Sequence, residues 1–346
     1  MALPADDAFI AADSPASRAR RRTSTYRRPR LATCRTQAAL SVQLRDRFVR
    51  STLFSLVLVL LAASIAGCRA AAAAGPPSVD GLSHVPTAVN DLQRASEDFA
   101  RLGFVLKPGR PHANGIRNNH IKFRDGTELE LIAASRSVDS ITASYLRFLS
   151  RGDGPAFLSL YVRDLARLAQ SMDTWGVASE RGEGFVSFPD DAPAAEIFFG
   201  GLNHSPTDLP QHFAHANGAD GLLAVWLAGK DLSAERQLLQ RLGGVQGVRS
   251  IDKPIKARAT TFRFGAGEVR LLPAAYEAAP GHPIVGVTLR VCDLAKTKDV
   301  LRAGGLSALV EGESVEGKSV YAAPAFAHGM WIEFLQPKDS RRSCAN

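Results

Sequence analysis

Two glutamates separated by one residue are the clearest candidates for chemistry in this chain. They lie in TELELIAA, residues 127–134, where Glu128 and Glu130 alternate with Leu129 and Leu131. Such alternation is typical of a strand with one buried face, so the leucines should pack on helices and both carboxylates should point into a cleft. A pair of carboxylates there could hold a metal or act as a base with a raised pKa. The alternative is that both point into water at the rim of a barrel.

An upstream segment, GRPHANGIRNN at residues 109–119, is dense in hydrogen-bond donors. Donors held beside paired carboxylates could orient the carbonyl or hydroxyl oxygens of a substrate. The candidate substrate-binding residues are His112, Asn114, Arg117, Asn118 and Asn119. The alternative is an Asn/Gly turn whose side chains bind their own backbone. The tetrapeptide HANG occurs again at residues 215–218, which raises the question of whether the chain contains repeats.

Four similar units follow one another from residue 81 onward. In each, a strand-like run leads to an aspartate, a stretch with helical spacing and then a glycine 12, 12, 12 or 11 residues after the aspartate. The aspartates are Asp91, Asp164, Asp231 and Asp293, and the glycines are Gly103, Gly176, Gly243 and Gly304. Aspartate caps the first turn of a helix, and glycine adopts the left-handed conformation that ends one. Two or three strand-like runs follow, which predicts an α+β fold of βαβββ modules whose paired sheets curl into cups.

These elements carry a resemblance to a known family. The stretches GLSHVPTAVNDL, GFVLKPGRPHANGIRNNHIKF, GTELELIAA and HGMWIEFLQP resemble the vicinal oxygen chelate superfamily, in particular its glyoxalase-like branch, over about residues 81–338. The resemblance implies βαβββ modules that pair into two cup-shaped half-barrels. It does not fix the reaction, because the superfamily includes isomerases, lyases, dioxygenases, epimerases and drug-binding proteins on one fold.

The resemblance also implies a metal site. Metal-using members supply a histidine from the first strand of a module and a carboxylate from the last, which here are His84 and Glu130. A divalent metal such as Zn, Fe, Ni or Mn would suit them, and Glu130 or Glu128 would be the catalytic proton carrier. In the other modules the histidine position falls on Phe157, Ala224 and Gly286. Only the fourth module repeats the carboxylate, as Glu333, so the site is incomplete and His84 could simply be a hydrogen-bonded strand residue.

The two HANG copies are expected to occupy non-equivalent places. The glyoxalase-like branch carries a loop resembling H-x-x-x-G-T-x-N, which His112 and Gly115 match, although Ile116 replaces the threonine and the spacing is one residue short. That departure leaves the asparagine position open. The second copy lies at the junction between the halves, where we expect it to shape the crossover. The nearby histidines at 204, 212 and 215 are loosely spaced on a Pro-containing loop, which favours a rim segment over a metal site.

The net charge of +8 does not indicate a nucleic-acid-binding protein. Residues 1–50 contain 11 of the 42 basic and 4 of the 34 acidic residues, so the remainder carries only +1. A domain close to neutral lacks the basic surface that DNA or RNA requires. Four cysteines are too few and too scattered for a disulfide framework or a zinc knuckle.

The N-terminal region has the pattern of an export signal. Arginines precede an apolar stretch at residues 53–65, which is too short for a comfortable membrane span, and Cys68 follows small residues as in a bacterial lipobox. We therefore expect a lipid on Cys68, membrane anchoring and a periplasm-facing place in the cell envelope. An ordinary cleaved signal peptide and an uncleaved anchor are the alternatives. The predicted division is a basic extension that is disordered or precedes the true start (1–50), a signal peptide (51–68), a linker (69–80) and two module pairs (81–210 and 211–340).

Two functions remain open at this point. The first is a glyoxalase-like envelope protein that binds a small oxygen-bearing molecule and carries out metal-dependent lyase, isomerase or dioxygenase chemistry. The second is a non-catalytic binding or sequestering module with a degenerate metal site. Because three of the four modules lack the first-strand histidine, the sequence somewhat favours the second.

Overall fold

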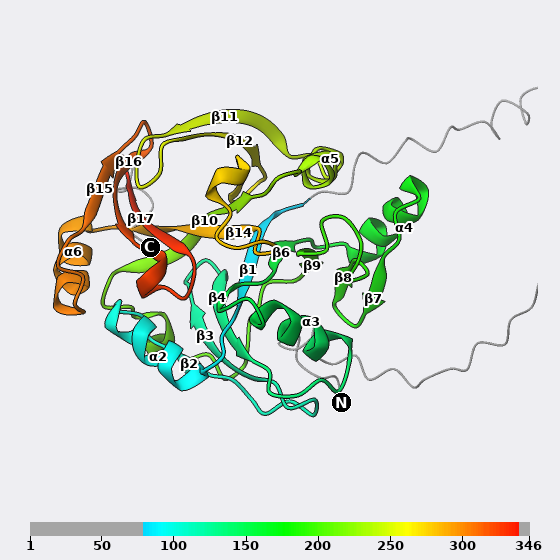
Figure 1. The fold of residues 1–346 in the computed structure, drawn as a ribbon, viewed down its shortest axis with the longest axis horizontal. Helices are drawn as coiled ribbons and strands as arrows, with labels where there is room; N and C mark the ends of the chain where they lie inside the picture. The colour runs from blue at the N-terminus through cyan, green and yellow to red at the C-terminus, as the bar shows by residue number, and fades with distance from the viewer. Residues whose placement is uncertain (1–78, 339–346) are drawn as a thin grey trace, which may run out of the picture. The chain divides into compact units, whose positions relative to one another are not determined.

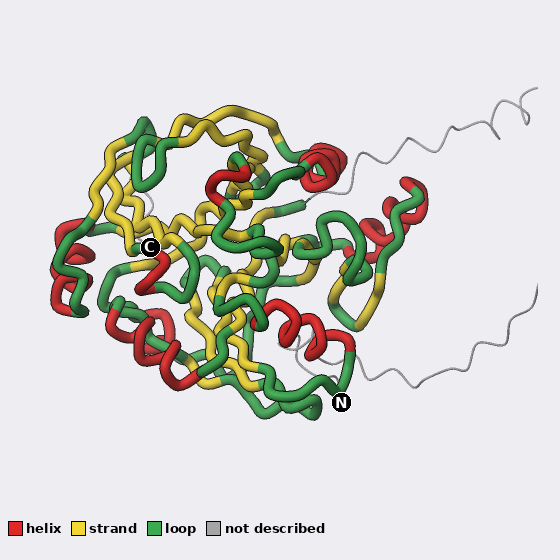
Figure 2. Tube along the Cα trace, viewed as in Figure 1, coloured by secondary structure: helices red, strands yellow, loops and turns green. Residues whose placement is uncertain are grey.

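The structure, a computed structural model, describes residues 79–338 (Figures 1 and 2). Along this part of the chain the order strand, helix, three strands occurs four times. The predicted N-terminal extension, the signal peptide with Cys68 and most of the linker lie outside the described residues. No helix between residues 79 and 338 is long and apolar enough to cross a membrane.

Two modules and an insertion form the first half. The first module consists of β1 (Gly81–Ala88), α2 (Leu92–Arg101), β2 (Lys107–Pro108), β3 (Arg117–Lys122) and β4 (Glu128–Ala133). The second consists of β6 (Leu158–Tyr161), α4 (Leu165–Trp175), β7 (Glu180–Gly182), β8 (Phe185–Ser187) and β9 (Ile197–Gly200). Between them lie α3 (Ser140–Leu149) and β5 (Gly154–Pro155), which the sequence analysis did not anticipate.

The second half contains the other two modules. The third consists of β10 (Ala219–Ala228), α5 (Ser233–Arg241), β11 (Val245–Ile251), β12 (Ala257–Arg263) and β13 (Glu268–Leu272). The fourth consists of β14 (Ile284–Val291), α6 (Leu294–Ala303), β15 (Val310–Glu313), β16 (Gly317–Ala322) and β17 (Trp331–Pro337). Short 3-10 helices occur at η2 (Pro210–Phe213), η3 (Ala274–Tyr276) and η4 (Pro324–Phe326).

Each half contributes one curled sheet. The first has the strand order β2-β3-β4-β1-β6-β9-β8-β7, with β5 beside β1, and the second has the order β11-β12-β13-β10-β14-β17-β16-β15. In both sheets the first strands of two modules meet antiparallel at the centre, and each lies parallel to the last strand of its own module. The concave faces are called the first cup and the second cup below. The first sheet ends at Gly200 and the second begins at Ala219, on either side of the predicted boundary at 210/211.

The helix ends follow the predicted caps with two corrections. Three helices begin as expected, with an aspartate side chain accepting a backbone N–H of the first turn: Asp91, Asp164 and Asp293. The third module differs, since Asp231 binds Ser233 N at 2.9 Å and α5 starts one residue later. At the end of α6 the left-handed residue is Gly305 (φ 102°) rather than Gly304, because the last turn continues one residue further.

The predicted faces of β4 are confirmed. Leu129 and Leu131 are fully buried in the main core together with Ala95 and Phe99 of α2. Burial of each leucine contributes about 2 kcal/mol, so a shift of one residue, which would exchange the faces, is strongly disfavoured. The register of β4 thus turns both glutamates into the first cup.

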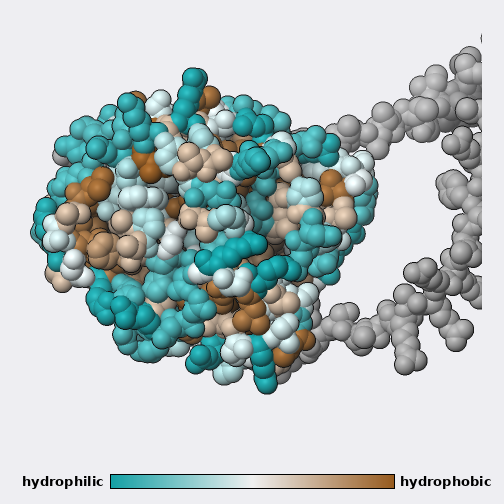
Figure 3. All heavy atoms as spheres, viewed as in Figure 1, coloured by the Kyte–Doolittle hydropathy of each residue, from teal (hydrophilic) through white to brown (hydrophobic). Residues whose placement is uncertain are grey.

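The exterior is mainly hydrophilic in the view of Figure 3, with hydrophobic residues in small groups.

Candidate functional site

Three adjacent strands place six chemically active side chains on the concave face of the first sheet. In the parallel pair β1 and β4, His84 lies beside Glu128. In the antiparallel pair β3 and β4, His120 lies opposite Glu130 and Lys122 opposite Glu128. Because alternate residues share a face, one cluster is formed by His84, Asn118, His120, Lys122, Glu128 and Glu130. All are buried or nearly so.

Glu128 is held as a carboxylate by two hydrogen-bond donors and by the ammonium charge of Lys122. Its Oε1 accepts from Asn203 Nδ2 at 2.9 Å and from His120 Nδ1 at 3.2 Å, and its Oε2 lies 3.4 Å from Lys122 Nζ. Burial alone would raise the pKa of Glu128, but the charges of His120 and Lys122 outweigh it and hold the pKa well below the usual range. Glu128 therefore stays ionised and fixes the ring of His120.

Glu130 has the opposite character. Burial, together with the nearby charge of Glu128, raises the pKa of Glu130, although His120 opposes this. Its Oε1 accepts a hydrogen bond from Asn118 Nδ2 at 2.6 Å, and its Oε2 lies 3.9 Å from His84 Nε2. A buried carboxyl with a raised pKa is suited to holding and releasing a proton.

The amide of Asn118 links this carboxyl to His120. Its Nδ2 also lies 3.2 Å from His120 Nε2, so one amide nitrogen can donate to both Glu130 and an unprotonated Nε2. The single ring hydrogen of His120 is then on Nδ1 and is donated to Glu128. The charge of Glu128 outweighs burial and raises the pKa of His120. A second proton on Nε2 would need the amide to rotate, so that its oxygen accepts instead.

His84 is a neutral imidazole. Burial lowers the pKa of His84 to about 4. The hydroxyl of Ser83 donates to Gly201 O at 2.8 Å and lies 3.0 Å from His84 Nδ1. Because that hydroxyl hydrogen is already used, Nδ1 carries the ring hydrogen and Nε2 presents a lone pair toward Glu130.

The side chains around this pair do not complete a metal site. His84 and Glu130 face each other as the resemblance implies, but a catalytic metal usually takes three protein ligands. Glu128, the nearest further carboxylate, is already bound by the ring of His120 and the ammonium group of Lys122. Among residues 79–338 no group of three or more His, Cys, Asp or Glu side chains is arranged to hold a metal. The residues present therefore do not fit a resident metal.

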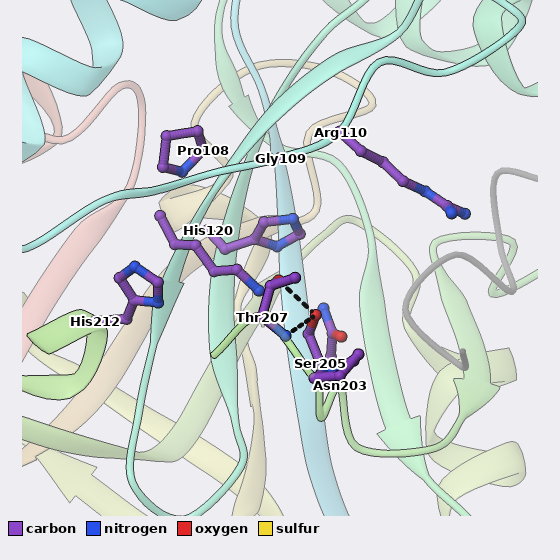
Figure 4. Close-up of a pocket in the computed structure, with 10 residues that line it drawn as sticks. Pro108, Gly109, Arg110, His120, Asn203, Ser205, Thr207 and His212 are labelled. Carbon is purple, nitrogen blue, oxygen red and sulfur yellow. Dashed lines mark hydrogen bonds between the residues drawn. The ribbon is translucent and has the colours of Figure 1, made fainter. Parts of the chain in front are cut away.

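An open pocket of about 490 Å³ reaches this cluster at His120 (Figure 4). Its walls come from the chain around β2 and from the connector after β9, and His120, Ser205, Thr207 and Asn203 gather at its centre. The chain passes so close over the cup that a Cβ on Gly109 would lie 1.8 Å from Asn118 Oδ1, so only glycine fits there. The pocket thus gives access to the outer member of a buried proton-holding cluster.

The five predicted loop residues divide into two groups. Asn118 binds Glu130, and His112 lies behind it with Nε2 3.3 Å from Asn118 Oδ1. The other three lie away from the carboxylates. Asn114 binds Asp139 and its own turn, Asn119 binds Ser96 of α2 and Arg117 is exposed. Of these three, only Asn114 binds the backbone of its own turn, as the alternative interpretation expects.

The second HANG copy has a structural role. His215 is buried, accepts Val105 N at 2.9 Å and lies 2.9 Å from Lys122 O, while Asn217 binds Leu102 O. Both copies form the same turn, with a left-handed glycine bonded back to the histidine carbonyl. The local conformation is shared, but the surroundings differ.

Several residues of the first cup lie outside the set of predicted substrate-binding and metal-binding residues, although His120 belongs to the donor-rich segment next to them. His120 and Lys122 could have been found, because with Asn118 they repeat every second residue along one strand face. Asp208 binds Lys107 at 2.6 Å and Lys122 at 3.1 Å from a connector without periodicity. Tyr145 comes from the unforeseen helix α3. It is fully buried, and its hydroxyl has no hydrogen-bond partner among the described residues.

The second cup differs from expectation. Glu333 is not alone, since its carboxylate accepts from four side chains at 2.7–3.1 Å: Arg270, Thr288, Ser319 and Tyr321. The stretch VRLLPA at residues 269–274 supplies the buried Arg270, which also binds Glu268 at 2.9 Å. Arg270 on β13 pairs with Trp226 on β10, and this position corresponds to that of Glu130 on β4, which pairs with Pro86 on β1. The third module thus places an arginine where the first has its carboxyl.

Two curled sheets of paired βαβββ modules around polar cups define the vicinal oxygen chelate fold. Residues 82–243 match the family model described as a glyoxalase-like domain, so this part of the chain is similar to that family. None of the curated proteins matches the sequence.

Solved structures with this fold include a dioxygenase fusion protein, a synthase and a ring-cleaving dioxygenase. A xylose isomerase-like TIM barrel/4-hydroxyphenylpyruvate dioxygenase fusion protein matches with a TM-score of 0.56 and 14% identity over 83% of this chain, which spans only 54% of that protein. A mutant 4-hydroxymandelate synthase from Streptomyces coelicolor matches with a TM-score of 0.55 and 14% identity, and the match covers 76% of this chain and 93% of the synthase. An extradiol ring-cleaving dioxygenase from B. fuscum matches with a TM-score of 0.52 and 13% identity, and the match covers 76% of this chain and 73% of the dioxygenase. At these identities the likeness concerns the fold.

Proposed function

We propose that the first cup binds a small oxygen-bearing molecule without a resident metal. The observation that carries this proposal is that the open pocket ends on His120, which contacts the buried carboxylate Glu128. The region that matches the glyoxalase-like family model, residues 82–243, contains every residue of this cluster.

We assign different roles to the two glutamates of this cluster. Glu130, whose pKa is raised, is the group that holds a proton and passes it within the cup. Glu128, whose pKa is lowered, stays ionised and orients His120. If the protein is an enzyme, proton transfer at an oxygen-bearing carbon, as in lyase or isomerase chemistry, is the step these residues support.

A second candidate is metal-dependent chemistry. It is favoured by one observation: the lone pair of His84 Nε2 and Glu130 Oε2 face each other at 3.9 Å. Metal analysis of the full chain after loading with Zn, Fe(II), Ni or Mn separates the candidates. We expect less than about 0.1 equivalent after dialysis, because two ligands bind weakly. One equivalent that is lost in His84→Ala would restore the metal-dependent candidate.

Ligand binding can be tested by NMR line broadening of glycolate, glycolamide and hydroxyacetone with the full chain. We expect at least one probe to bind, and Thr207→Trp to abolish binding because the indole fills the pocket. Thr207 is exposed on the pocket wall, so its replacement should not disturb folding. Thr174→Trp on the exposed face of α4 is the control. Failure of all three probes, or binding unchanged in Thr207→Trp, would refute the proposal.

The proposed place of this function is the cell envelope, with the chain anchored through a lipid on Cys68. The support is the signal-like pattern of residues 51–68. Radiolabelled palmitate should enter the full chain and Cys34→Ser, but not Cys68→Ser. Equal incorporation in all three would end this proposal.

A further inference from the structure

The pocket of the first cup has an unbalanced set of side chains. Its described walls contain Lys107, Arg110, His120 and His212, together with hydroxyl and amide groups, but no aspartate or glutamate. Arg110 extends away from the centre in Figure 4 and is not used below. A wall with cationic groups and no carboxylate favours an anion.

The tautomer of His212 is fixed toward donation. Its Nδ1 accepts the backbone N–H of Leu209 at 3.1 Å, so the ring hydrogen of neutral His212 is on Nε2. Ser205 Oγ and Thr207 Oγ1 lie 2.8 Å apart, and because one hydrogen bond joins them, the second hydroxyl hydrogen is left for a ligand.

An internal carboxylate already bridges the two lysines beside the pocket. Asp208, on the connector, lies 2.6 Å from Lys107 Nζ and 3.1 Å from Lys122 Nζ, and its Oδ2 accepts Ser205 N at 3.0 Å. Its side chain is 12% exposed, whereas Lys122 is 2% exposed. A carboxylate on a connector beside the pocket can give way to another anion more easily than the buried Lys122 can move.

We propose that the ligand of the first cup is a small organic anion, a carboxylate or phosphate ester, bound by Lys107, His212 and the Ser205–Thr207 hydroxyls, with Asp208 acting as a built-in competitor for the lysine. This inference rests on the proposed function and specifies the charge of its ligand. Neutral oxygen-bearing molecules of the same shape bind more weakly, because they offer no negative charge to the ammonium group of Lys107.

Glycolate and glycolamide test the charge directly, since they have nearly the same shape and differ in one charge. By NMR titration of the full chain we expect glycolate to bind at least about tenfold more tightly. Its binding should weaken several-fold between roughly 20 and 200 mM NaCl. Inorganic phosphate should compete with it. Equal binding of glycolate and glycolamide would overturn the inference that the ligand is an anion and would leave the proposed function standing. If glycolate, glycolamide and hydroxyacetone all fail to bind, both the inference and the proposed function are overturned.

Variants test the assignment of residues. Lys107→Gln should weaken glycolate binding by about tenfold, and Lys318→Gln on β16, in the other sheet, should not change it. Asp208→Asn and Asp208→Ala should tighten binding several-fold, because they remove the competitor. A merely structural aspartate would give the opposite sign. Weaker binding in both Asp208 variants, with an unchanged melting temperature, would overturn the competitor role.

Discussion

The two cups place a glutamate at the same register and give it opposite surroundings. Glu130 lies beside Pro86 and Glu333 beside Thr288, each on the last strand of its module. Glu130 receives a neutral amide donor, whereas Glu333 receives the Arg270 guanidinium at 3.1 Å. The comparison teaches that one backbone can hold either a proton-carrying carboxyl or a fixed ion pair, depending on the charge placed opposite.

The neighbouring carboxylates show the same contrast. In the second cup, Arg270 outweighs burial and lowers the pKa of Glu268. Arg249 adds a further charge 3.2 Å from Glu268, so this cup is crossed by alternating charges. In the first cup, cationic groups neutralise Glu128 and Asp208 in this way. Glu130 differs from both, since its hydrogen-bond donor is the neutral amide of Asn118.

Removal of the arginine of the second cup should have the largest effect. In Arg270→Met the buried Glu333 and Glu268 lose their main cationic partner, so we expect the free energy of unfolding to fall by about 4 kcal/mol. Denaturant titration measures it. Arg258→Met, at an exposed position of β12, should change it by less than about 0.5 kcal/mol. A loss below about 1 kcal/mol in Arg270→Met would mean that the ion pair does not hold this cup.

The two glutamates of β4 should respond differently to the same substitution. Glu128→Gln leaves Lys122 and His120 without their shared carboxylate and should cost about 3 kcal/mol. Glu130→Gln preserves the acceptor for Asn118 and should cost less than about 1 kcal/mol at pH 7. Denaturant titration of both variants checks this. Equal losses would contradict the assignment of different roles.

A buried pair outside both cups should dominate the pH dependence. Burial, with the charge of Glu235 on α5, raises the pKa of Glu196 to about 8. The folded state then keeps a proton that the unfolded chain releases above about pH 4.5, so stability falls as the pH rises toward 8. Glu196→Gln should remove roughly 2 kcal/mol of this fall.

Urea titrations at pH 5 and pH 8.5 measure that difference, with the exposed Glu180→Gln as the control. The same fall in Glu196→Gln and in the unchanged chain would rule out this source. If Glu196→Gln removes the loss of stability between pH 5 and pH 8.5, the remaining pH responses of the two cups can be compared in that variant.

The smallest effect is expected for Arg117. Its side chain is exposed and lies on the face of β3 opposite to the carboxylates. Arg117→Gln should change stability by less than about 0.5 kcal/mol and leave glycolate binding unchanged. A clear loss of binding, by NMR titration, would return this residue to the site and extend the first cup beyond its concave face.

The sequence by itself determined the modules and the faces of their strands. Asp91 and Gly103 mark the two ends of one helix, and the alternation of leucine and glutamate around Glu130 places Glu130 on the cup face of its strand. Both features can be predicted because capping and strand periodicity are local and repeat along the chain. It also favoured His84 as the partner of Glu130, through the family resemblance.

Only the tertiary structure decided what those residues do. The third module brings Arg270 to Glu333 across 63 residues, and the connector brings Asp208 to Lys122 across 86 positions of the sequence. No periodicity links such residues, since their contact arises from strand pairing between modules and from a loop that folds back over the cup. The charge opposite each glutamate follows from that packing.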